Sequence, residues 1–162
     1  MIEWEERPIE VQSLLNPAFC GEIMLECIKT YNVKSGSFPI TLAFLIFPLV
    51  LHQPTREILP FSSKYLHSAL NQNKEVLIGF SQRANHMISI TIETLFFLLQ
   101  TEVLKVDSYG KITINKKVKL SKIPESRDSE IQDCLNKSHQ LGRLFSKGGK
   151  PSTIYAMFGV RP

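Results

Sequence analysis

A helix pattern that runs directly into a hairpin pattern is the feature that most constrains how this chain folds. Within residues 87–99, apolar residues recur at the spacing of one helical face. These residues are Met87, Ile88, Ile90, Ile92, Leu95, Phe96, Leu98 and Leu99. Because this apolar face is wide, we expect the helix to be mostly buried, as the spine of the core. After Glu102, two short alternating runs, 103–106 and 111–114, flank a turn with Asp107 and Gly110, which is typical of a β-hairpin.

Patterns elsewhere predict further helices. Asn16 and Pro17 form a helix start, and the apolar face that follows ends near Tyr31. A second helix is expected to open at Pro39 and to kink near Phe44, because Pro48 removes a backbone donor. We expect a connector at 52–60, helices from Ser62 or Ser63 to about 71 and over 74–84, a long helix over 131–145, and a final turn or two at 152–158.

These patterns predict a mainly α (α+β) fold: a helical domain with a winged-helix-like helix plus β-hairpin unit and a long C-terminal helix. A helix followed by a two-stranded ribbon is the way in which a winged helix-turn-helix ends. The length suits a single domain over 1–162. Within it we predict an N-terminal arm at 1–15, a helical core at 16–118 with the hairpin near 103–117, and C-terminal helices and tail at 126–162.

The longest apolar run, 38–51, contains two prolines and is shorter than the roughly 20 residues that a membrane-spanning helix needs. The first residues lack the basic and apolar regions of a secretory signal. We therefore expect a cytoplasmic protein without membrane contact.

Charge is distributed unevenly along the chain. Residues 1–30 hold six acids and two basic residues, a net −4, whereas residues 103–150 hold eleven Lys or Arg and five acids, a net +6. The basic half is suited to phosphate or to an acidic protein surface, and the acidic N-terminus to a basic one. The candidate phosphate contacts on and after the hairpin are Lys105, Lys111, Lys116, Lys117 and Lys119.

The helix before the hairpin offers almost no side chain that reads base edges, since its polar residues are Ser89, Thr91, Glu93, Thr94 and Gln100. We therefore do not expect sequence-specific recognition of DNA. Two interpretations of the lysine-rich hairpin stay open. It either contacts DNA phosphates without sequence specificity or is simply solvated.

Residues that would support catalysis or metal binding show no suitable spacing. None of His52, His67, His86 and His139 lies in a His-x-x-x-His or Glu-x-x-His pair, and three cysteines without a Cys-x-x-Cys pair favour reduced core thiols. The glycines at 142, 148 and 149 fail as a phosphate loop, because Pro151 follows Lys150. We expect no catalytic residue, no metal and no cofactor.

Three separated patches together resemble one family. The first is Trp4 with Arg7-Pro8 and residues 15–20; the second is residues 45–52 with 55–57 and 59–60; the third is residues 141–147 with 153–162. The chain resembles the small middle component of bacterial three-component ABC systems, the group related to Lamassu antiphage defence.

This resemblance implies a non-enzymatic subunit made beside an SMC-like or Rad50-like ABC ATPase and an effector, for example a nuclease. The candidate partner-interface residues are Trp4, Arg7, Tyr155, Met157, Phe158 and Arg161. The segment with Tyr155 and Phe158 is either a docking tail or a tuck into the core. The alternative function is a free-standing winged-helix DNA-binding regulator.

Overall fold

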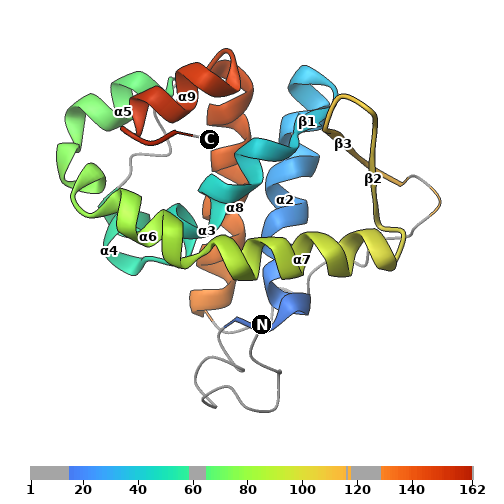
Figure 1. Ribbon diagram of the computed structural model, residues 1–162. Helices are drawn as coiled ribbons and strands as arrows, with labels where there is room; N and C mark the ends of the chain where they lie inside the picture. The colour runs from blue at the N-terminus through green and yellow to red at the C-terminus, as the bar shows by residue number, and fades with distance from the viewer. Residues whose placement is uncertain (1–14, 59–64, 116, 118–128, 162) are drawn as a thin grey trace.

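The computed structural model describes residues 15–58, 65–115, 117 and 129–161. Two long helices, α2 (Pro17–Ser35) and α8 (Ser129–Lys147), lie side by side, and α7 (Ile88–Gln100) crosses α2 (Figure 1). Shorter helices pack beside them: α3 (Ile46–Val50), α4 (Gln53–Ile58), α5 (Leu66–Gln72), α6 (Phe80–His86) and α9 (Pro151–Met157), with 3-10 helices η2 (Ile40–Leu45) and η3 (Lys74–Leu77). The predicted mainly α architecture with a long C-terminal helix is confirmed.

The start of α2 follows the predicted capping chemistry. The Asn16 side chain accepts a hydrogen bond from the backbone N–H of Ala18 at 2.8 Å, and Pro17 occupies the first helical position. The helix continues beyond Tyr31, where we expected it to end, and stops at Gly36, whose φ of 83° favours glycine.

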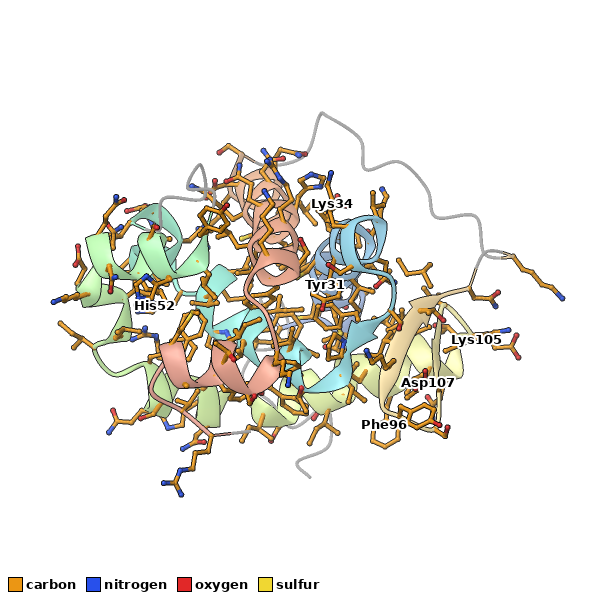
Figure 2. The ribbon with its side chains drawn as sticks, turned by 90° about the horizontal axis from the view of Figure 1, so that it is seen from above. Tyr31, Lys34, His52, Phe96, Lys105 and Asp107 are labelled. Atoms are coloured by element: carbon orange, nitrogen blue, oxygen red, sulfur yellow. The ribbon has the colours of Figure 1, made fainter. Side chains whose placement is uncertain are left out.

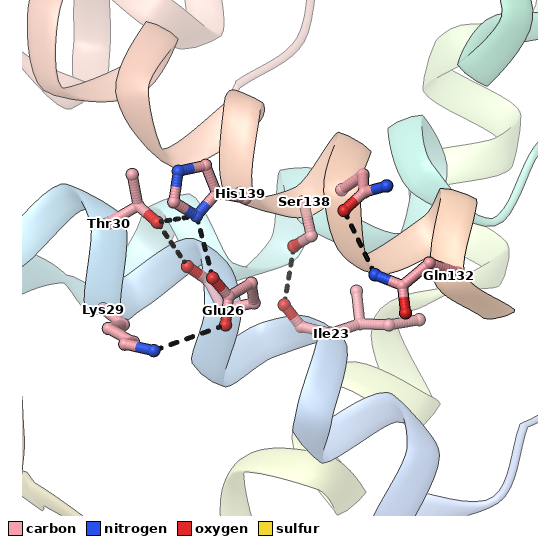
Figure 3. Close-up of polar contacts among 8 residues, drawn as sticks. Ile23, Glu26, Lys29, Thr30, Gln132, Ser138 and His139 are labelled. Atoms are coloured by element: carbon pink, nitrogen blue, oxygen red, sulfur yellow. Dashed lines mark hydrogen bonds and ion pairs between the residues drawn. The ribbon is translucent and has the colours of Figure 1, made fainter. Parts of the chain in front are cut away.

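Close approach of two backbones characterises the α2–α8 seam. A Cβ atom added to Gly142 would overlap the Cys27 carbonyl oxygen, so only glycine fits there. Ser138 Oγ donates to the Ile23 carbonyl at 2.6 Å, and His139 Nδ1 lies 2.8 Å from Glu26 Oε1 (Figure 3). Gly142, which failed as part of a phosphate loop, thus has a packing role.

The predicted hairpin is confirmed and joins a third strand. Strands β2 (Leu104–Val106) and β3 (Lys111–Ile114) pair antiparallel, and β1 (Phe38–Pro39) pairs with the other edge of β3, giving the order β1-β3-β2. The register places Lys105 opposite Thr113 and Phe38 opposite Ile112. The inward side chains Leu104 and Ile112 are buried against the helices.

Several predicted helix boundaries are wrong for local reasons. The helix expected from Pro39 begins as strand β1 and becomes the 3-10 helix η2, which gives way to α3 at Ile46. Pro48 therefore lies in the first turn of α3, where it is tolerated, and not inside the single kinked helix that we expected. The predicted helix over 74–84 is divided into η3 and α6, because Gly79 adopts φ 64°. Ser62 and Ser63, expected to cap the helix that is now α5, lie outside the described residues.

The predicted connector at 52–60 contains helix α4, whose first turn includes Pro54. His52 caps this helix, since its Nδ1 accepts the backbone N–H of Thr55 at 3.3 Å. Proline is tolerated in the first turn of a helix because the N–H groups there lack intrahelical acceptors.

The expectation that α7 is the mostly buried spine of the core is also wrong. Ile90, Leu95 and Leu98 face inward, whereas Ile88, Ile92, Phe96 and Phe97 are exposed. The core instead lies among α2, α8, η2, α3 and their neighbours. Its largest fully buried side chains include Phe38, Phe47, Phe80 and Phe145.

Candidate partner-binding site

The C-terminal segment packs into the core. Tyr155 is 5% exposed, and its hydroxyl donates to the Thr41 carbonyl at 2.6 Å; burial raises the pKa of this phenol. The Phe158 ring stacks on Phe80, with ring centroids 4.8 Å apart. Of the two open alternatives, the structure shows the tuck into the core for Tyr155 and Phe158. Met157 remains half-buried and Arg161 exposed, so they are the predicted interface residues of this segment that a partner can reach.

A cavity of about 480 Å³ lies beside this segment. Its walls come from four parts of the chain: η2 (Thr41, Phe44, Leu45), α6 (Ser81, Ala84, Asn85), the start of α7 (Ile88), and the C-terminal segment (Tyr155, Gly159, Val160, Arg161). Most lining side chains are apolar, and Arg161 is the charged residue among them. This composition suits an apolar side chain with a negatively charged group near the rim.

Two residues of the cavity wall, Phe44 and Ile88, were not predicted as site residues. Phe44 and Ile88 have the spacing of core positions, and nothing in the local pattern indicates that they share a cavity with Arg161. The relevant sequence signal is that α7 has more apolar residues than one buried helix face can hold, which indicates an exposed apolar surface but not the cavity.

The lysines of the hairpin form the second accessible surface. Lys105 and Lys111 are exposed on the outer face of the β2–β3 ribbon, and Lys117 is exposed just beyond it. Figure 2 shows Lys105 and Asp107 on the ribbon, on the same side of the molecule as the end of α7 that carries Phe96. The structure therefore brings Lys105 and Lys111 onto one face. Lys116, Lys119, Trp4 and Arg7 lie outside the described residues.

A buried arginine fastens α4 to α8. The Arg56 side chain is 4% exposed, and its Nε donates to Asp133 Oδ2 at 2.8 Å, its Nη2 to Glu130 Oε1 at 3.0 Å and its Nη1 to the Val50 carbonyl at 2.8 Å. Both carboxylates are partly solvated, at 41% and 66% exposure. Every Arg56 contact is therefore internal, and the group is structural.

The histidines and cysteines occupy separate surroundings. His52 lies before α4, His67 in α5, His86 in α6 and His139 in α8. Cys20, Cys27 and Cys134 are buried free thiols, and burial raises the pKa of Cys20 to about 12 and also raises those of Cys27 and Cys134. Such thiols are protonated at neutral pH and unreactive. Among the described residues, no group of three His, Cys, Asp or Glu side chains could hold a metal ion.

Comparison with known families shows to which protein family the chain belongs. A family model described as ABC-three component (ABC-3C) system Middle Component 3 matches residues 4–162. The chain belongs to this family. Membership implies that this middle component functions with other components of a three-component ABC system.

No curated protein and no solved structure matches this middle component. Within the part of the chain that the structure describes, no helix has both the length and the apolar character needed to cross a membrane.

Proposed function

We propose that this middle component is a non-catalytic adaptor that links an SMC-like or Rad50-like ABC ATPase to an effector, for example a nuclease. In this proposal the complex acts in the cytoplasm as a Lamassu-related antiphage defence system. The adaptor helps to hold the effector inactive until foreign DNA is sensed. The observation that carries the proposal is the family match over residues 4–162.

The surface chemistry supports an adaptor. The C-terminal segment presents the half-buried, apolar Met157, whereas the outer face of the hairpin presents Lys105 and Lys111. Two surfaces of different chemistry suit two different partners, because an apolar surface favours an apolar partner and a basic surface favours an acidic one. Trp4 and Arg7 are further proposed interface residues, because tryptophan and arginine are enriched at binding hot spots.

Co-expression tests the proposal directly. The full chain, carrying an affinity tag, is produced together with the ATPase and effector components of its own system, and the purified material is analysed by size-exclusion chromatography with light scattering. We expect both components to co-purify with the tagged chain at a fixed ratio. Failure of either component to co-purify contradicts the linking role.

The outward hairpin lysines favour one alternative, a free-standing winged-helix DNA-binding regulator. That function predicts sequence-selective binding of duplex DNA with a steep dependence on salt, and its loss when Lys111, Lys116 and Lys117 are all replaced by Glu. The adaptor proposal instead predicts weak binding that is indifferent to sequence. Fluorescence anisotropy with a set of duplexes at two salt concentrations distinguishes the two.

A further inference from the structure

The outer face of α7 carries an apolar stripe that nothing in the described structure covers. We call Ile88, Ile92 and Phe96 the α7 stripe; their side chains are 41%, 37% and 59% exposed. Spacings of four residues place them along one side of the helix. Phe96 projects outward from α7 (Figure 2). Glu93 is the one charged residue among the thirteen of this helix, so the stripe has the character of a helix-packing seam.

We propose that the α7 stripe is the interface of a homodimer in which α7 packs antiparallel against α7 of a second copy. The two-fold axis passes beside Ile92. In such an isologous contact the same patch serves both partners. Ile92 then faces Ile92 of the second copy, and Ile88 faces Phe96.

The cavity beside Arg161 supplies the shape complementarity of this dimer. Ile88 lines the cavity together with Phe44 and Val160. Because Phe96 of the second copy lies opposite Ile88 in the antiparallel arrangement, its ring is positioned to enter this mainly apolar cavity of about 480 Å³. The exposed aromatic ring of each copy therefore fills the cavity of the other, twice per dimer.

Charge at the two ends of α7 selects the antiparallel orientation. Arg161 lines the cavity at the Ile88 end, and Glu102 is exposed just beyond the other end of the helix. Antiparallel packing brings Arg161 near Glu102 of the second copy, whereas parallel packing brings cation to cation and acid to acid. The two helix dipoles also oppose each other favourably in the antiparallel pair.

The proposed contact is small for a protein–protein interface. A helix of thirteen residues is about 20 Å long. Two such helices and the occupied cavities bury on the order of 1,000 Å², which is near the lower limit of specific interfaces. The dimer is therefore concentration-dependent, and its test needs a method that traps it.

Cysteine trapping suits this chain because its three native thiols are buried. We introduce Ile92→Cys, which lies beside the proposed axis, and oxidise the full chain with diamide. A disulfide requires Cα atoms within about 7 Å, and only residues near the axis meet their own copy at that distance. We expect a covalent dimer on non-reducing gels. Val33→Cys and Ile78→Cys, at positions 78% and 74% exposed, are matched controls that should remain monomeric.

Sedimentation of the untagged chain over a concentration series gives the second measurement. We expect a monomer–dimer equilibrium that Phe96→Glu weakens by at least about tenfold, as expected for a central aromatic anchor. Arg161→Glu should weaken it, and Arg161→Glu combined with Glu102→Arg should restore it. Circular dichroism checks that each variant is folded.

Three outcomes overturn the homodimer. One is a monomer at every concentration, and another is Ile92→Cys cross-linking no faster than Val33→Cys. A stripe that is protected from labelling only when the ATPase or effector is bound would assign it to that partner and would likewise overturn the inference. Because cross-linking and sedimentation use the chain alone, their results are independent of whether the adaptor proposal holds.

Discussion

The side chain of His52 shows how one neutral ring stabilises a helix end. Its Nδ1 accepts the Thr55 N–H and lies 2.7 Å from Thr55 Oγ1, which in turn accepts from Arg83 Nη2 at 3.3 Å. Burial, and then the positive charge of Arg83, lower the pKa of His52 below its ordinary value of 6.5. Protonation of Nδ1 would remove the acceptor and bring a second cation near Arg83.

This geometry predicts a pH-dependent contribution of His52 to stability. Because its pKa is lower in the folded state, the unfolded chain binds the proton more readily, and stability is lost as the pH falls from about 6.5 towards the folded-state pKa. His52→Asn keeps a capping side chain but cannot titrate. We expect the difference in urea midpoint between pH 7.5 and pH 5.5 to be smaller in this variant than in the wild type. An equal difference in both proteins would contradict the role of His52.

Arg56 gives a second prediction at the residue scale. Arg56→Met removes three internal hydrogen bonds and leaves the buried Val50 carbonyl without its guanidinium donor. Asp133 and Glu130 remain partly solvated, which limits the loss to about 2 kcal/mol rather than the larger cost of stranding a buried charge. Urea unfolding followed by circular dichroism measures this loss. Glu130→Gln is the control, and we expect it to cost less than about 1 kcal/mol because the carboxylate is mostly exposed.

The α2–α8 seam gives a prediction at the scale of the element. Gly142→Ala would gain up to about 1 kcal/mol from intrinsic helix propensity in an isolated helix. In this chain the added Cβ would meet the Cys27 carbonyl oxygen and would lie 3.0 Å from Thr30 Cβ. Overpacking of this kind costs about 1–3 kcal/mol, so we expect net destabilisation. Asn136→Ala, on the exposed side of α8, should be neutral or slightly stabilising in the same thermal unfolding measurement.

Elements whose signal is local were predictable from the sequence. The Asn16-Pro17 start of α2 and the hairpin around Asp107 and Gly110 depend on capping and turn chemistry within a few residues. Asp107 Oδ1 accepts the backbone N–H groups of Tyr109 and Lys111, which holds this turn. Helix α4 was not predicted, because histidine is not one of the usual N-capping residues and because Pro60 was interpreted as a helix break.

Features that depend on tertiary partners were not predictable. The spacing of apolar residues in α7 indicates a helix but not which side faces the core, since Ile88, Ile92 and Phe96 are as apolar as Ile90, Leu95 and Leu98. The candidate cavity joins Phe44, Ile88 and Arg161 from distant parts of the chain. No local pattern encodes that juxtaposition.

At the scale of the whole molecule, the C-terminal segment is part of the core. Removal of residues 151–162 would uncover Phe80 and remove the buried side chains of Ile154, Tyr155 and Phe158. The loss of each such side chain costs about 2–5 kcal/mol. The three losses together are comparable to the whole free energy of unfolding of an ordinary domain. We expect the truncated chain to lose cooperative thermal unfolding in calorimetry. A shorter truncation after Val160, which removes only Arg161 and Pro162, should retain the transition.

The α2–α8 seam also has a consequence for biosynthesis. Its partners are far apart in the sequence, since Ser138 contacts Ile23 and His139 contacts Glu26. Non-local contacts slow folding, because bringing together segments far apart in the sequence costs loop-closure entropy before the contacts form. During translation, α2 emerges from the ribosome long before α8 exists, and its apolar face stays without its main partner. The apolar face of α2 is therefore covered by its main partner only after residues 129–147 have been synthesised.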